Sequence, residues 1–263
     1  SHILAAMFVA RVGGVLAHFM CVLRVIPQIG TGAQFSTDIL GVLFRFGGWL
    51  AVSSLVTPVI LFVDRIYVAT LFGPASVTYY VTPYEVVTKL WILSASLLGA
   101  LFPVLSAMEP RSQEVGRVAR KAFLILLVVT TPAVGVLLAY GRDLLALWIS
   151  PELAQHSSTV AKWLAVGVLG NVLAQGPLTV LQATGKPEIV ARLQVIQLPV
   201  YILVAWWLSR KFGTVGIAMA WAMRAAIELI CLQAAAGRWT ALEGIRLTRQ
   251  TAIGGTIVVM FLG

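Results

Sequence analysis

The sequence is built from apolar runs long enough to cross a lipid bilayer as helices. A membrane-spanning helix needs roughly 20 apolar residues at a rise of about 1.5 Å per residue. Seven runs meet this length and an eighth is shorter. They cover residues 3–26, 46–72, 79–105, 118–140, 159–183, 189–208, 215–236 and 251–263. Because the runs are continuous, whereas strands of a membrane barrel alternate over about 10 residues, we predict an all-α, polytopic membrane helical bundle.

Composition excludes an ordinary soluble domain and argues against nucleic acid as a partner. Hydrophobic residues make up 59% of the chain and charged residues 11%, and the mean hydropathy is +0.93. In soluble domains about a quarter of the residues are charged. The net charge of +9 comes largely from basic residues between the apolar runs, where membrane proteins carry them. We therefore expect the lipid bilayer, and no nucleic acid, as a partner.

Basic residues between the runs predict how the chain is oriented. Eleven lie in or beside the gaps after the first, third, fifth and seventh runs, and three lie in the other gaps. The eleven are Arg24, Arg45, Arg111, Arg117, Arg120, Lys121, Lys186, Arg192, Arg238, Arg246 and Arg249, and the three are Arg142, Arg210 and Lys211. Because basic loops stay in the cytoplasm, we predict that the first group lies there. Residues 140–158 then form an interfacial loop on the far side.

Two adjacent runs carry charges that a lipid-facing helix would lack. Asp64 and Arg65 lie in the second run, and Glu85 and Lys89 lie in the third. Asp64 is about 12 Å and Glu85 about 9 Å from the outer end of its helix, so the two pairs lie at similar depth. Glu85 and Lys89 are four residues apart and can pair on one helical face. Asp64 and Arg65 point about 100° apart, so each needs another partner, which could be Lys89, Glu85 or a ligand.

Two further spans carry charge. Arg224 and Glu228 in the seventh run are four residues apart, so they too can neutralise each other within the bundle. Arg224 lies about 15 Å from the outer end of its helix, and Arg11 lies about 22 Å from the cytoplasmic end of the first run. Arg11 has no adjacent acid, so we expect it to face a hydrated cavity. Its alternatives are to extend to the interface or to meet an acid outside this sequence.

The sequence contains no catalytic, metal or cofactor motif. Phosphate-binding Walker loops, serine-hydrolase elbows, zinc-protease helices and paired-cysteine metal sites do not occur. A membrane glycosyl-transfer enzyme would need large outer loops with paired carboxylates or arginines, whereas the outer loops offer only Asp143, Glu152 and His156. We expect no enzyme, no metal and no cofactor, with glycosyl transfer as the weakest alternative.

Residues 46–110 carry a further set of markers. These are Gly48 with Trp49, Asp64 with Arg65, and residues 79–89, which read Tyr-Tyr-x-x-Pro-Tyr-Glu-x-x-x-Lys. With these markers the stretch resembles the bacterial polysaccharide flippase family, the O-antigen type within the multidrug/oligosaccharidyl-lipid/polysaccharide exporter superfamily. The rest of the chain is similar to that family in hydropathy and helix number.

The resemblance implies a fold of two six-helix lobes that face each other across a central cavity. On that template residues 1–45 hold the last helix of the first lobe and a cytoplasmic linker, and residues 46–236 form the second six-helix lobe. Residues 237–263 would be a cytoplasmic loop and a truncated extra helix. The sequence is then expected to be a fragment of a longer protein.

The resemblance also implies a function, which is to flip an undecaprenyl-diphosphate-linked oligosaccharide from the cytoplasmic to the periplasmic leaflet of the bacterial inner membrane. The cations expected to bind the diphosphate are Arg11, Arg65, Lys89 and Arg224. The acids expected to position them, or to titrate with a coupling proton or sodium ion, are Asp64, Glu85 and Glu228. The alternative reading is a cation-coupled multidrug or lipid II exporter of the same superfamily. Whether these charges bind cargo or only clasp helices together stays open at this point.

Overall fold

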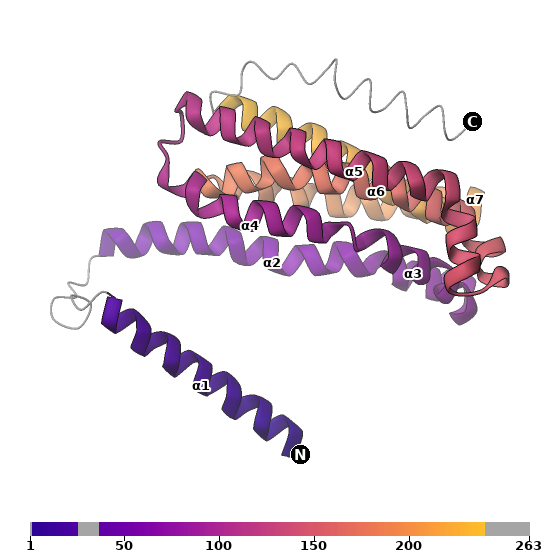
Figure 1. Cartoon of the computed structure of the whole chain (residues 1–263), viewed down its shortest axis with the longest axis horizontal. Helices are drawn as coiled ribbons and strands as arrows, with labels where there is room; N and C mark the ends of the chain where they lie inside the picture. Colours follow the sequence, from indigo (N-terminus) through magenta and orange to yellow (C-terminus); the bar gives the residue numbers. More distant parts are fainter. Residues whose placement is uncertain (1, 26–36, 240–263) are drawn as a thin grey trace. The chain divides into compact units, whose positions relative to one another are not determined.

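The computed structural model describes residues 2–25 and 37–239, and each element in these ranges is an α-helix (Figure 1). The helices are α1 (His2–Val25), α2 (Thr37–Phe72), α3 (Pro74–Thr88), α4 (Trp91–Ala107), α5 (Gln113–Trp148), α6 (Pro151–Ala183) and α7 (Pro187–Trp239). The chain divides into two compact units, Ser1–Arg45 and Phe46–Gly263. The predicted all-α membrane fold is confirmed, while the expected run at residues 251–263 lies outside the described residues.

Six helical segments of the described residues are long and apolar enough to cross a membrane, so the chain is a multi-pass membrane protein. The count differs from the seven complete runs predicted because α7 contains two of them. This helix of 53 residues is broken at Gly213, where φ is 61° and ψ is −140°. Glycine adopts a positive φ without the steric cost that a side chain would add. The predicted runs 189–208 and 215–236 are therefore two arms on either side of this break.

The third predicted run is divided between α3 and α4. At the junction the N–H of Leu90 donates to the carbonyl of Val87 at 3.2 Å, and the N–H of Ile92 donates to the carbonyl of Lys89 at 3.1 Å. These bonds reach back three residues instead of four, so the helix tightens for one turn. The tightened turn comes immediately before Trp91, which lines the cavity described below.

The prediction of an interfacial loop at residues 140–158 is wrong. Helix α5 continues to Trp148 and α6 begins at Pro151. The hydroxyl of Ser150 accepts a hydrogen bond from the N–H of Leu153 at 3.2 Å, which caps the new helix. Proline suits the first helical position because the N–H that it lacks would have no partner there. These two residues replace the expected loop with a tight turn between long helices.

The second unit is built around α6 and α7. Helices α5, α3 and α4 pack against α6, and the fully buried Trp221 of α7 belongs to the main hydrophobic cluster. A Cβ at Gly167 of α6 would overlap the Trp221 ring, so glycine is what allows these two helices to approach so closely. Helix α2 is more exposed, with Leu55, Phe62 and Ile66 turned outward. The loose packing of α2 leaves room for a cavity beside α6 and α7.

The turns of the second unit gather at two ends (Figure 1). One end carries the α2–α3 turn at Gly73, the α5–α6 turn at Ser150 and the break at Gly213. The other carries the α4–α5 turn and the α6–α7 turn, with Arg111 and Lys186. We name the second of these the basic end.

Candidate functional site

A polar cavity of about 490 Å³ lies between α2, α6 and α7, beside the first residue of α4. Its polar lining residues are Ser53, Ser54, Thr57, Trp91, Asn171, Gln175, Gln182, Gln194, Arg224 and Glu228, and its apolar ones are Leu50, Pro58, Ile60, Leu61 and Leu178. The volume falls in the range of roughly 300–1,000 Å³ that is usual for small-ligand pockets. Ten polar side chains around one space, two of them charged, are costly among apolar membrane helices, so this cavity is the candidate site.

The cavity runs from the middle of the second unit toward its basic end. On α2 its lining extends from Leu61 back to Leu50, and on α6 it extends from Asn171 to Gln182, about 16 Å along each helix. Gln182 lies next to the end of α6, at the α6–α7 turn. The deep end of the cavity is therefore near Asn171 and the shallow end is near the basic turns.

Arg224 and Glu228 form a buried ion pair in the lining. The Nη1 of Arg224 donates to the Oε2 of Glu228 at 2.7 Å, and each residue is only 6% exposed. This confirms the predicted pairing of the two residues on one helical face. The Cζ of Arg224 also lies 5.9 Å from the ring centroid of Tyr201, while the Nε of Arg224 has no hydrogen-bond partner within the described chain. Arg224 is thus neutralised by Glu228 and still has an N–H group, at Nε, that is available to donate a hydrogen bond.

Asp64 lies close to this pair but fully inside the protein. It is 0% exposed, and its Oδ2 accepts a hydrogen bond from the hydroxyl of Tyr80 at 3.1 Å. Its Oδ1 finds no hydrogen-bond partner among the residues that the structure describes. The carboxylate lies within electrostatic reach of Arg224 and Arg65. The partners predicted for Asp64 are Lys89, Glu85 or a ligand, whereas its hydrogen-bonding partner is Tyr80, which the sequence offers only as part of the marker at residues 79–89.

Arg65 and Glu85 join α2 to α3. The Nη2 of Arg65 donates to the Oε1 of Glu85 at 2.8 Å, which confirms the similar depth predicted for these two charged positions. The suggested pairing of Glu85 with Lys89 is wrong, because Glu85 turns toward α2 and Lys89 lies exposed at the C-cap of α3. The Arg65 guanidinium also lies 5.2 Å from the ring of Tyr84 and 5.0 Å from the ring of Phe62.

The structure brings Asp64, Arg65, Arg224 and Glu228 into one region of the second unit. Arg11 lies on α1 in the first unit, where its side chain is exposed. Its place at a hydrated cavity stays a prediction.

Sequence reasoning missed the aromatic and amide side chains around these charges. The ring of Tyr84 lies 5.7 Å from that of Trp221 and 6.3 Å from that of Trp91, so an aromatic cluster separates Arg65 from the deep core. Asn171 and Gln194 are each 7% exposed and line the cavity. The sequence gives little indication of a role for these two amides, because single amides occur throughout apolar runs. Whether such a side chain faces the cavity depends on how distant helices pack.

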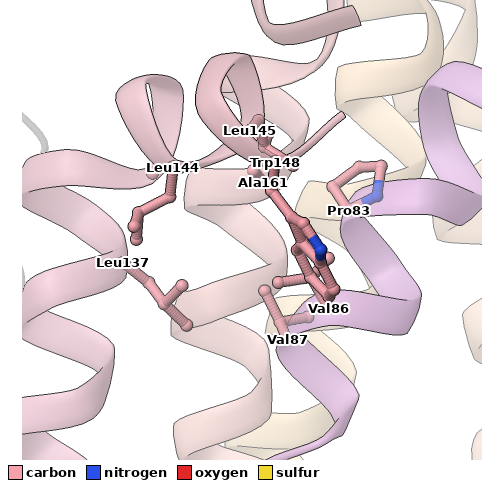
Figure 2. A pocket seen from close by; sticks show the side chains of 9 residues that line it. Pro83, Val86, Val87, Leu137, Leu144, Leu145, Trp148 and Ala161 are labelled. Carbon is pink, nitrogen blue, oxygen red and sulfur yellow. The ribbon is translucent and has the colours of Figure 1, made fainter. Parts of the chain in front are cut away.

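A second, apolar pocket lies between α3, α5 and α6 (Figure 2). It is lined by Pro83, Val87, Leu137, Trp148 and other apolar side chains and has a volume of only about 20 Å³. That is space for about one water molecule, which would find no polar partners there. This pocket therefore carries no chemistry, and the polar cavity remains the candidate site.

The fold and the cavity define the class of the protein, which is a multi-pass helical membrane protein with a charged, polar cavity inside its bundle. The profile of the polysaccharide biosynthesis protein family matches residues 4–155. A Shigella flexneri protein named "Putative O-antigen transporter" is 30% identical over 203 residues, which cover 77% of this chain and 48% of that protein. The chain belongs to the polysaccharide biosynthesis protein family, which confirms the resemblance drawn from the sequence. It spans about half the length of this relative, and no solved structure matches it.

Proposed function

We propose that this chain forms the second lobe of a transporter that flips a lipid-linked oligosaccharide across the bacterial inner membrane, from the cytoplasmic to the periplasmic leaflet. The observation that carries the proposal is the polar cavity with the buried Arg224–Glu228 pair in its wall. Membership of a polysaccharide biosynthesis family, and similarity to a protein named as an O-antigen transporter, support a polysaccharide cargo.

The cavity suits a headgroup that carries both phosphate and sugar. Such a group cannot enter hydrocarbon unaided, because buried polar groups need hydrogen-bond partners. An arginine guanidinium offers several donors in a planar fork that matches phosphate oxygens. Arg224 uses one of its terminal nitrogens for Glu228, so it can hold its position while other donors serve an anion. Glu228 then keeps the cation in place when no cargo is present.

The remaining predicted residues take different roles in this proposal. Arg65, which does not line the cavity, is a second cation that the diphosphate would meet outside it, held by Glu85. Asp64 is the candidate for a coupling proton or sodium ion, since it is buried beside both arginines and has one oxygen without a hydrogen-bond partner in the described part of the chain. Lys89, whose side chain is exposed, would act at the rim of the cavity, and Arg11 of the first unit keeps its proposed role as a cation for the diphosphate.

The position of the cavity supports the proposed direction of transport. The lining reaches Gln182 beside the basic end, and basic loops are expected to be cytoplasmic. Cargo would therefore enter from the cytoplasmic leaflet and leave after the cavity reopens on the other side. A multidrug exporter of the same superfamily fits less well, because an apolar drug would leave the amide and hydroxyl groups of the lining without partners.

Export in living cells tests the proposal. In a host that lacks the gene, we expect Arg224→Gln to abolish surface polysaccharide when its amount in the membrane is matched to that of the unaltered protein by induction, since the unpaired Glu228 lowers stability. Arg210→Gln is the matched control, because Arg210 is exposed on the same helix and lies over Trp206, 4.5 Å from its ring centroid. Normal display with Arg224→Gln would rule out this use of the cavity. Drug sensitivity or a peptidoglycan defect, without loss of surface polysaccharide, would favour the other exporters.

A further inference from the structure

We propose that the cavity has two chemically different ends, and that its neutral end, lined by amide and hydroxyl side chains, is the subsite that recognises the sugar part of the cargo. This assignment rests on the proposed function and deepens it. It names Gln175, Gln182 and Gln194 as residues that determine which sugar is carried.

The packing of α6 against α7 sets the position of the charged end. A Cβ at Gly170 would lie 3.3 Å from the carbonyl carbon of Ala225, so Gly170 and Ala225 lie side by side. Asn171 and Arg224, which neighbour them in sequence, are therefore at about the same depth. The charged pair thus lies level with the deepest amide of the cavity.

The neutral end extends from this level toward the basic end. Asn171, Gln175 and Gln182 are four and seven residues apart on α6, a spacing that keeps them within about 40° of one another around the helix. Gln194 faces the same space from α7, and Ser53 faces it from α2. Beyond Glu228, the polar side chains that line the cavity carry no charge. The cavity therefore changes along its length from an ion pair to a set of neutral donors and acceptors.

Buried groups of this neutral set lack partners among the described residues. The Oε1 of Gln194, the Oγ of Ser53 and the Nε1 of Trp91 have no hydrogen bond, and Gln194 and Ser53 are 7% and 8% exposed. Buried polar atoms are nearly always hydrogen-bonded in native proteins. Three such atoms come from three helices around one space. Each atom is itself buried, so its side chain must turn about its own bonds to reach the cavity, where a polar ligand would supply the partner that the protein does not.

The chemistry of these groups distinguishes a sugar from a diphosphate. An amide offers two N–H donors and one carbonyl acceptor, and a hydroxyl both donates and accepts. Sugar hydroxyls have the same double character, so each can satisfy a carbonyl and an N–H together. Phosphate oxygens only accept, so they would leave the carbonyl of Gln194 unpaired. The neutral end is thus matched to hydroxyl-rich cargo, while the guanidinium of Arg224 is matched to phosphate.

Binding measurements with three probes test this division. The probes are undecaprenyl diphosphate, the same lipid carrying the oligosaccharide of the host, and the free oligosaccharide, each titrated against the purified protein as its host makes it. We expect the sugar-bearing lipid to bind the unaltered protein more tightly than the bare lipid. Gln194→Leu should weaken binding of the sugar-bearing lipid about threefold to tenfold, the value of a typical hydrogen bond, and leave the bare lipid unchanged. Gln155→Leu, an exposed position on α6, is the matched control and should change neither.

The other outcomes would contradict the sugar subsite, the proposed function or both. If the unaltered protein binds neither lipid, the proposed function fails and this subsite fails with it. If it binds both lipids equally, or if Gln194→Leu weakens both equally, the sugar subsite is wrong and the proposed function stands. Gln175→Leu, at a half-buried position, repeats the test if Gln194→Leu does not fold. If the free oligosaccharide binds and the same variants weaken its binding, the subsite recognises sugar without the lipid. If the variants leave its binding unchanged, the free sugar binds at another place, which counts against the subsite.

Discussion

Arg65 and Glu85, twenty residues apart in sequence, form an ion pair of 2.8 Å that joins two consecutive antiparallel helices. The pair is only partly buried, with 28% of the Arg65 side chain and 52% of the Glu85 side chain exposed. On its far side the Arg65 guanidinium lies over the rings of Tyr84 and Phe62. The arginine is therefore held from two directions, and the acid supplies only one of them.

Exchanging the two charges separates a structural clasp from a binding role. We expect Arg65→Glu or Glu85→Arg alone to lower the free energy of unfolding by about 1 kcal/mol or less, because partly exposed ion pairs contribute little. The double exchange should restore the part of that stability that comes from the pair itself, as measured by unfolding in detergent, while the new carboxylate at position 65 still lies near the buried Asp64. It should not restore surface polysaccharide, because the guanidinium would then extend from α3, away from Asp64 and the aromatic rings. Restored display would show that the pair acts only as a clasp.

The hydrogen bond from Tyr80 to Asp64 is expected to stabilise the second unit. Tyr80→Phe leaves the buried carboxylate without the donor at 3.1 Å, and an unsatisfied buried group costs about 1–3 kcal/mol. The free energy of unfolding should fall by that amount. Tyr140→Phe is the matched control, because it removes the same hydroxyl from a ring that is 60% exposed. Equal effects of the two variants would contradict a special role for the Tyr80 hydroxyl.

The buried pair of Arg224 and Glu228 should respond differently to single and double replacement. Glu228→Gln removes one partner and leaves a buried cation, so we expect the free energy of unfolding to fall by about 3–5 kcal/mol. Arg224→Met together with Glu228→Met removes both charges and should recover most of this loss, since apolar replacements of a buried pair are often tolerated. Unfolding in detergent measures both. The double variant should still fail to display polysaccharide, and a double variant that exports normally would remove the pair from the mechanism.

The sequence was sufficient to predict where the helices are, and less able to predict how they end. Long apolar runs follow directly from the thickness of the bilayer, so their positions were predictable. Hydropathy alone predicts a gap between helices at Gly213 and a loop at Ser150 and Pro151, although a cap followed by proline is a helix-start signal. At both places local backbone chemistry, and not hydropathy, determines where the helices end.

The candidate site was predictable to the extent that its residues are charged. Asp64, Arg65 and Arg224 stand out because a charge is rare in an apolar span. The partner of Asp64 and the amides of the cavity could not be chosen from the sequence, since Tyr80 and Gln194 are ordinary residues in membrane helices. Which of them face inward depends on the rotation of each helix against its neighbours, which hydropathy does not encode.

Two glycines should respond in opposite ways to a methyl group. A Cβ at Gly216 would overlap the backbone carbonyl of Leu208, so Gly216→Ala must move one arm of α7 and should lower the free energy of unfolding by about 1–3 kcal/mol. A Cβ at Gly141, one of the residues that line the small apolar pocket, meets nothing within 4 Å. Because alanine also favours a helix by about 1 kcal/mol over glycine, Gly141→Ala should be neutral or stabilising. Thermal unfolding of both variants is the measurement, and a loss at Gly141 as large as that at Gly216 would contradict this packing.

The orientation of the cavity can be tested with single cysteines. In a background where Cys21 and Cys231, the free cysteines of the described chain, are replaced by serine, Gln182→Cys places a thiol at the shallow end of the cavity. If the basic end is cytoplasmic, a membrane-impermeant thiol reagent should label it in inside-out vesicles and not in intact spheroplasts. Val68→Cys is the buried control, since Val68 is 0% exposed, and it should stay unlabelled in both preparations. Labelling of Gln182→Cys only in spheroplasts would reverse the orientation, and cargo would then have to enter the cavity from the periplasmic leaflet.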